Sequence, residues 1–183
     1  MHEIDDFDWE FANFQPHEAT KRFRKFSSVF DSETLRGKIL VTMGFLEDLL
    51  ARGIKEFLVE TNHGVFQGFA RRSLGSLSAK QHLAYLLGII SEEEFEIIER
   101  MAKIRNLFAH DPMISGADEK IRNHTRDLAK LLNLDQYKES ESSNCVEETW
   151  GMTHWALLVP LMNRPERASE YRLRTREWEL SAP

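Results

Sequence analysis

A helical repeat of apolar residues constrains the fold of this chain more than any other feature of its sequence. In the segment SETLRGKILVTMGFLEDLLARGIKEFL, residues 32–58, apolar side chains recur at intervals of three or four. Because an α-helix turns once in about 3.6 residues, this spacing places them on one face. The predicted inward positions are Leu35, Ile39, Met43, Leu46, Leu50, Ile54 and Phe57. We therefore expect a long amphipathic helix at the centre of the core.

Periodicity of the same kind continues through most of the chain, and glycine and proline are few. A shorter helix is expected before the long one, at 17–30, with Phe23 and Phe26 facing inward. The later helices are expected at about 76–88, 92–109, 117–132, 147–162 and 166–180. The predicted fold class is all-α: a single-domain multi-helix bundle with a long central helix and a charged C-terminal helix.

One domain is expected to cover residues 1–183, because this length suits a single core. Its predicted parts are an N-terminal arm and short helix at 1–31, a core at 32–135, an exposed linker at 136–147 and C-terminal helices at 148–183. The C-terminal side chains expected to pack against the core are Trp150, Trp155, Leu158, Leu161 and Trp178. The segment 61–76 contains Gly64, Gly68 and Gly75 and is expected to be a loop.

The helix expected at 92–109 has clear signals at both ends. Ser91 and Glu94 have the spacing of a capping box. The pair Asp111–Pro112 should end the helix, because a residue before proline is disfavoured in helical conformation. The inward face predicted between these ends is Ile97, Met101, Ile104 and Phe108.

Charge and composition restrict the partners and the location of the chain. Its formal net charge is -6, so it has no general excess of positive charge for binding nucleic-acid phosphates. Its single cysteine permits neither an internal disulfide nor a cysteine zinc cluster, and its histidines lack ligand spacing, so no metal and no cofactor are expected. The acidic N-terminal sequence is unlike a signal peptide, and no apolar run is long enough for a membrane span. We expect a cytoplasmic protein without membrane contact.

The segment MAKIRNLFAHDPM contains the strongest candidate for a functional site. Arg105 precedes His110 by five residues, which is a rotation of about 140° on a regular helix, whereas Asn106 and His110 share a face. The last turn of a helix favours a charged imidazole. An arginine that holds a phosphate beside a histidine that moves protons suffices for metal-free RNA cleavage, in which the ribose 2′-hydroxyl is the nucleophile.

The same residues also have a purely structural interpretation. Arg105 would then pair inside the bundle with Glu47 or Asp48 from the long helix, while Asn106 and His110 cap backbone groups and Asp111 ends the helix. Both interpretations remain open from spacing alone.

Other basic residues are candidates for contact with an anion or a nucleic acid. Arg71 and Arg72 lie just before the helix start SLGSLS, where Ser76, Ser78 and free backbone N–H groups could attract anions. The arginines Arg172, Arg174 and Arg176 lie in a C-terminal segment interleaved with glutamates.

A helix-turn-helix in the segment KQHLAYLLGIISEEEFEIIERM is disfavoured by charge. The second helix of that motif enters the major groove with its N-terminal residues. Here that end carries Glu92, Glu93, Glu94 and Glu96, which phosphates would repel.

Three blocks resemble the bacterial mannitol operon repressor family: FLEDLLARGIKEFL at 45–58, GSLSAKQHLAYLLGIISEEEFE at 75–96 and IRNLFAHD at 104–111. Their order and spacing also match. The resemblance implies an all-helical regulator of transcription, acting on sugar-alcohol uptake without a recognised DNA-binding motif. A protein partner or a homodimer is expected, with DNA or RNA contact left open but not through a helix-turn-helix.

The Arg-Asn-x-x-x-His pattern is also similar to the signature of the HEPN superfamily of helical domains. That resemblance implies a metal-independent, toxin-like endoribonuclease in which Arg105 stabilises phosphate, His110 transfers the proton and Asn106 orients them. It also implies a dimer that brings two copies of the motif together. A non-catalytic helical scaffold or immunity-type binding protein is the third possibility.

Overall fold

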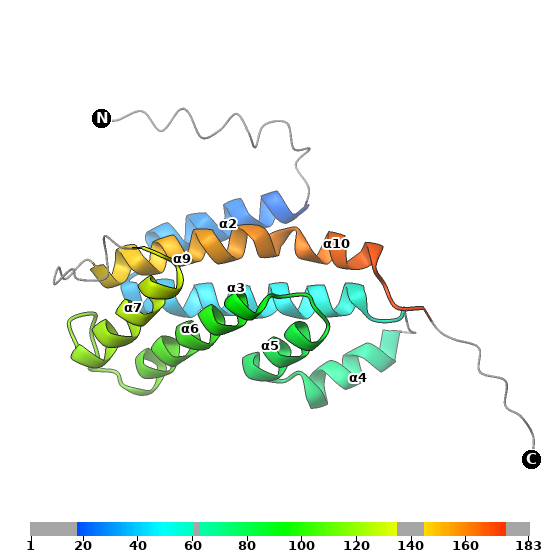
Figure 1. Ribbon diagram of the computed structural model, residues 1–183, viewed down its shortest axis with the longest axis horizontal. Helices are drawn as coiled ribbons and strands as arrows, with labels where there is room; N and C mark the ends of the chain where they lie inside the picture. The colour runs from blue at the N-terminus through cyan, green and yellow to red at the C-terminus, as the bar shows by residue number, and fades with distance from the viewer. Residues whose placement is uncertain (1–17, 61–62, 135–144, 175–183) are drawn as a thin grey trace, which may run out of the picture.

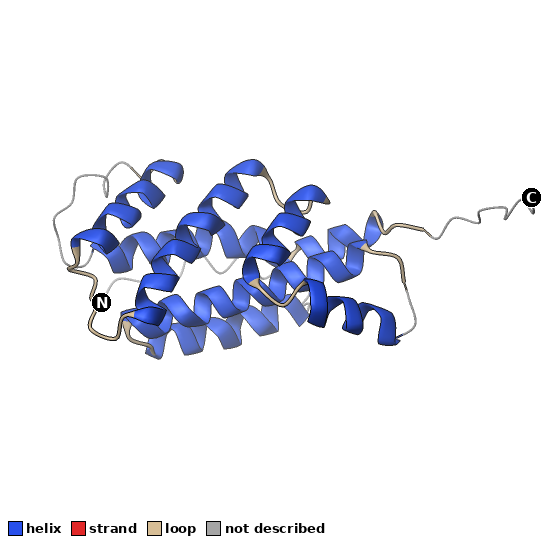
Figure 2. Cartoon of the chain, turned by 90° about the horizontal axis from the view of Figure 1, so that it is seen from below, coloured by secondary structure: helices blue, strands red, loops and turns tan. Residues whose placement is uncertain are grey.

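The computed structural model describes residues 18–60, 63–134 and 145–174. All regular structure within these residues is helical, as Figure 2 shows. The helices are α2 (Glu18–Ser32), α3 (Leu35–Phe57), α4 (His63–Ser73), α5 (Leu77–Leu86), α6 (Glu92–His110), α7 (Glu119–Leu131), α9 (Cys145–Met162) and α10 (Arg164–Glu170). The predicted all-α, multi-helix fold is confirmed.

The long helix α3 is the centre of this bundle. In Figure 1, α2, α9 and α10 lie above α3, α5 lies below it, and α6 also packs against it. The helix α7 packs against both α6 and α9 and so links the two sides. The predicted inward residues that are buried are Ile39, Met43, Leu46, Leu50 and Ile54. Leu35 and Phe57, at the two ends of α3, are only half-buried.

The helix α3 begins later than the sequence pattern suggested. Thr34 is its N-cap, and the Thr34 hydroxyl accepts a hydrogen bond from the Gly37 N–H at 3.2 Å. This cap separates α3 from α2, which continues to Ser32. Phe26 of α2 is buried as predicted, and Phe23 is half-buried.

The start and the end of α6 agree with the sequence signals. The Ser91 hydroxyl accepts from the Glu94 N–H at 3.2 Å, and the Glu94 carboxylate accepts from the Ser91 N–H at 2.8 Å. Asp111 is the C-cap. The predicted inward residues Ile97, Met101, Ile104 and Phe108 are all buried. The capping box and the Asp-Pro stop therefore define this helix as expected.

The expectation of a loop at 61–76 is wrong for most of that segment, because His63–Ser73 forms the helix α4. Glycine in a helix interior costs only about 1 kcal/mol relative to alanine, which other interactions can offset. Phe66 packs against the core and anchors α4, while Val65 and Phe69 on the same helix remain exposed. The helix therefore forms despite its glycines.

The expected helix at 166–180 is much shorter than predicted. The helix α10 ends at Glu170, and residues 171–174 are not helical. The Leu173 N–H donates to the Phe57 carbonyl at 2.8 Å, and the Arg172 Nε donates to the Glu56 carbonyl at 2.9 Å. These bonds to the end of α3 replace the bonds of a continued helix. Trp178, the predicted anchor, lies outside the described residues.

The expectations for 136–162 need two corrections. The linker predicted at 136–147 lies largely outside the described residues, but α9 already begins at Cys145. Trp150, Leu158 and Leu161 are buried as predicted, whereas Trp155 is 49% exposed. His154 faces inward instead of Trp155. The buried face of α9 includes residues 150, 154, 157, 158 and 161.

Candidate functional site

The Arg-Asn-x-x-x-His motif lies on the surface at the end of α6. The helix remains regular through His110, so Arg105 and His110 leave it about 140° apart, and only Asn106 shares the face of His110. Arg105 is half-buried, and Asn106 and His110 are exposed. We call the group Arg105, Asn106, Ala109, His110 and Met113 the motif surface. One copy of the chain does not present Arg105 and His110 as a same-face pair.

The carboxylates expected to bind Arg105 have other partners. Glu47 accepts from Lys80 Nζ at 2.6 Å. Asp48 pairs with Arg22 at 2.7 Å and with Arg52 at 3.0 Å. Glu47 and Asp48 are therefore not ion-paired with Arg105, because cations from α2, α3 and α5 pair with both carboxylates.

The motif side chains have no partner among the residues that the structure describes. The side chains of Arg105, Asn106 and His110 form no hydrogen bond or ion pair with any other described residue. Asp111 serves the turn after the helix, because its Oδ1 accepts from the Met113 N–H at 2.9 Å. A binding partner would therefore not need to displace an ion pair with any residue of the described part of the chain.

The backbone below the motif is held by Arg36 of α3, which sequence reasoning missed. Its Nη2 donates to the carbonyls of Asp111, Pro112 and Ile114 at 3.1, 3.0 and 3.1 Å, and its Nη1 donates to the carbonyl of Phe108. The last carbonyls of a helix lack partners within the helix and carry partial negative charge, so a guanidinium satisfies them well. The only signal in the sequence is that Arg36 follows the inward-facing Leu35.

The α4 arginines also remain accessible. Arg71 and Arg72 are exposed in the last turn of α4 and form no ion pair within the described part of the chain. Of the two serines nearby, Ser76 caps α5 by accepting from the Ala79 N–H at 3.2 Å. The Ser78 hydroxyl lies 3.4 Å from Nδ1 of His82. The serines thus serve local structure, whereas the two arginines have no described partner.

The C-terminal arginines differ from one another. Arg172 binds Glu56 and also Glu60, the latter at 3.3 Å, so its charge is compensated within the chain. Arg174 is exposed, and Arg176 lies outside the described residues. The structure therefore favours Arg71 and Arg72 over Arg172 as contacts for an external anion.

Within residues 18–60, 63–134 and 145–174, no three histidine, cysteine, aspartate or glutamate side chains lie together as a metal-ligand set. None of the described helices combines the length and the apolar character that a bilayer span requires.

Comparison with known proteins identifies no matching family model, no matching curated protein and no matching solved structure. The structure by itself defines the class: an all-α bundle with an Arg-Asn-x-x-x-His motif on the surface at the end of a capped helix.

Proposed function

We propose that this chain is a bacterial transcriptional regulator of the mannitol operon repressor type, which acts through a protein partner or a DNA contact without a helix-turn-helix. The observation that carries this proposal is the open, regular helical end at the motif surface. Arg105 and His110 diverge on it, which suits recognition of a partner better than convergence on one reacting group. The rigid backbone below it, held by Arg36, suits the same role.

A DNA contact would use Arg71 and Arg72. They are exposed and uncompensated by described acidic groups, and phosphate neutralisation supplies most non-specific DNA affinity. The net charge of -6 keeps this contribution small, so the protein partner remains part of the proposal.

The test is an electrophoretic shift of promoter DNA from the operon that encodes the chain, with and without host extract, at several salt concentrations. We expect a salt-sensitive shift, and replacing Arg71 and Arg72 with alanine should lower the slope of log affinity against log salt by about 2. Arg126→Ala on α7 is the matched control and should leave the slope unchanged. Absence of any shift in both conditions, with unchanged transcription in a strain lacking the gene, would contradict the proposal.

A HEPN-type ribonuclease is the second candidate, favoured by the absence of a described carboxylate partner for Arg105. Since Arg105 and His110 diverge on one helix, this chemistry needs a second copy that brings its Arg105 to the first copy's His110. We expect RNA fragments ending in 2′,3′-cyclic phosphate, lost in His110→Ala and retained in His82→Ala, a change at an exposed histidine on α5. Intact RNA after incubation with the folded wild-type protein would exclude it and leave a scaffold or immunity-type protein.

A further inference from the structure

A pocket of about 600 Å³ lies where α3, α10 and the turn between α5 and α6 meet. It is near the start of α6, whereas the motif surface is at the end of that helix. The lining residues are Phe57, Leu87, Gly88, Ile89, Arg164, Arg167, Ala168 and Tyr171. Its volume falls within the range of about 300–1,000 Å³ that is usual for small-molecule sites. We propose that this pocket binds a small organic anion with one negative charge and an apolar, aromatic body, independently of the proposed function.

The inner wall of the pocket is apolar and its backbone donors are already used. Phe57, Leu87, Ile89 and Ala168 supply the apolar surface. Gly88 has a φ of 68°, which allows the sharp turn between α5 and α6. The Gly88 N–H donates to the Tyr85 carbonyl, and the Ile89 N–H donates to the Ala84 carbonyl. These two N–H groups are therefore not available to a ligand. Polar recognition must therefore come from side chains.

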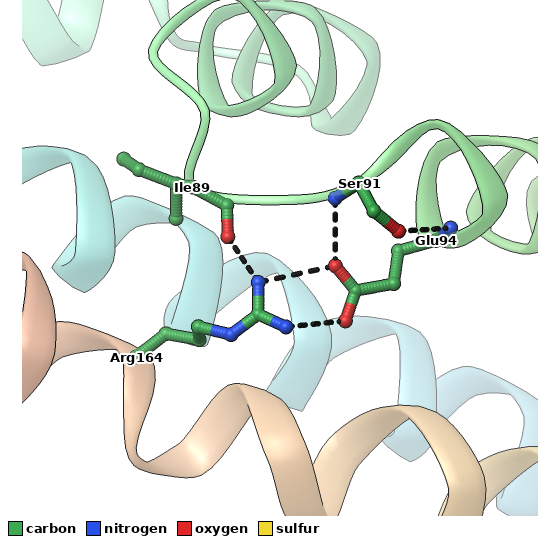
Figure 3. Close-up of polar contacts among 4 residues, drawn as sticks. All are labelled: Ile89, Ser91, Glu94 and Arg164. Atoms are coloured by element: carbon green, nitrogen blue, oxygen red, sulfur yellow. Dashed lines mark hydrogen bonds and ion pairs between the residues drawn. The ribbon is translucent and has the colours of Figure 1, made fainter.

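One arginine of the pocket, Arg164, is paired with a carboxylate of the chain. Figure 3 shows the Arg164 guanidinium between the Ile89 carbonyl and the Glu94 carboxylate, which also accepts from the Ser91 N–H. Its Nη2 lies 2.7 Å from Glu94 Oε1 and its Nη1 lies 3.1 Å from Oε2. Arg164 therefore forms part of the wall and contributes no net charge to a ligand.

The next arginine, Arg167, is the one that can receive an anion. It lines the same pocket, is exposed and has no acidic partner among the described residues, in contrast to Arg164 and Arg172. Tyr171, four positions later, is 72% exposed at the rim and offers an aromatic face and a hydroxyl group. The pocket thus offers one positive charge without a described acidic partner, next to apolar and aromatic surface. A ligand that complements it carries one negative charge on an apolar body.

The proposal is tested by isothermal titration calorimetry of the full chain with 4-phenylbutanoate, its uncharged amide 4-phenylbutanamide, and acetate. We expect saturable binding of 4-phenylbutanoate, an affinity lower by about tenfold for the amide because a charge-assisted contact is lost, and no measurable binding of acetate. Failure of 4-phenylbutanoate to bind, or equal affinity for the acid and the amide, would overturn the proposal.

Variants identify the residue responsible. Arg167→Ala should bind the acid and the amide with equal affinity, Arg167→Lys should retain most of the preference for the acid, and Arg126→Ala should behave as the wild type. Circular dichroism verifies that each variant is folded, which is expected because the Arg167 side chain makes no described internal bond. A preference for the acid that persists in Arg167→Ala would overturn the assignment. None of these readouts depends on DNA or RNA.

Discussion

At the scale of single residues, His154 is the least expected feature of the core. Its side chain on α9 is 2% exposed, and its ring lies 4.9 Å from Phe26 and 4.5 Å from Phe30 between centroids. Its Nδ1 is buried without a hydrogen-bond partner in the described part of the chain. Burial lowers the pKa of His154 to about 4, and the nearby Asp31 opposes this shift only in part. The neutral imidazole therefore acts as an apolar group.

The lowered pKa of His154 predicts that the stability of the fold depends on pH. Because the folded pKa of about 4 lies below the ordinary value of 6.5, the unfolded chain binds the proton more readily. The contribution of His154 is therefore fully present above pH 6.5 and is lost as the pH falls toward 4. Between pH 7.5 and 4.5 the wild type should lose roughly 2–3 kcal/mol more unfolding free energy in urea than His154→Phe. Equal losses in the two proteins would contradict this account.

At the scale of secondary-structure elements, the contact between the start of α3 and the end of α6 decides how the candidate site is built. Local signals end α6 at His110. The carbonyls of its last turn and of the following turn accept hydrogen bonds from Arg36, which lies 72 to 78 residues earlier in the sequence than these carbonyls. The guanidinium also lies 5.4 Å from the centre of the Phe108 ring. The motif surface thus depends on a residue of another helix.

We expect Arg36→Ala to destabilise the fold by about 2–4 kcal/mol, because four backbone carbonyls lose a charged donor. The bonds to Phe108 and Ile114 are half-buried, and those to Asp111 and Pro112 are exposed. Amide hydrogen exchange at 109–114 should also accelerate more than exchange in α5. Chemical unfolding and exchange measured by mass spectrometry provide both readouts. Arg126→Ala, which removes one exposed bond to Asn123, is the control and should change stability by less than about 0.5 kcal/mol. Equal effects of the two substitutions would argue against the role of Arg36.

At the scale of the whole molecule, the C-terminal helices are part of the main core. Trp150 is 1% exposed, and its Nε1 donates to the Thr42 hydroxyl of α3 at 3.2 Å. Leu157, Leu158 and Leu161 belong to the same buried cluster as Ile39 and Leu46. The helices α9 and α10 both pack against α3. Removal of these helices would expose the centre of the bundle.

A chain ending at Leu134 should therefore fail to unfold cooperatively and should bind a hydrophobic dye strongly. A chain ending at Arg174, which keeps every described contact, is the control and should unfold in a single transition close to that of the full chain. Thermal unfolding followed by circular dichroism compares them. A cooperative transition at an unchanged midpoint in the shorter chain would show that residues 1–134 fold without the C-terminal helices.

The sequence alone determined most of the helical segments and most of the faces that turn inward, because both depend largely on local spacing. The stripe of α3, the capping box at Ser91 and the stop at Asp111 needed no distant residue to be recognised. Where local signals compete, as between glycines and apolar spacing in α4, the glycines were misleading, because their cost within a helix is only about 1 kcal/mol each and other interactions can offset it.

Only the tertiary structure decided which charges meet. Asp48 and Glu47 bind Arg22 and Lys80 rather than Arg105, and Arg167 alone of the pocket's two arginines lacks an acidic partner among the described residues. Spacing along the chain carries no information about such pairs, since they form between helices that the fold brings together. For this reason the sequence could not predict that the side chains of the candidate site have no partner among the described residues.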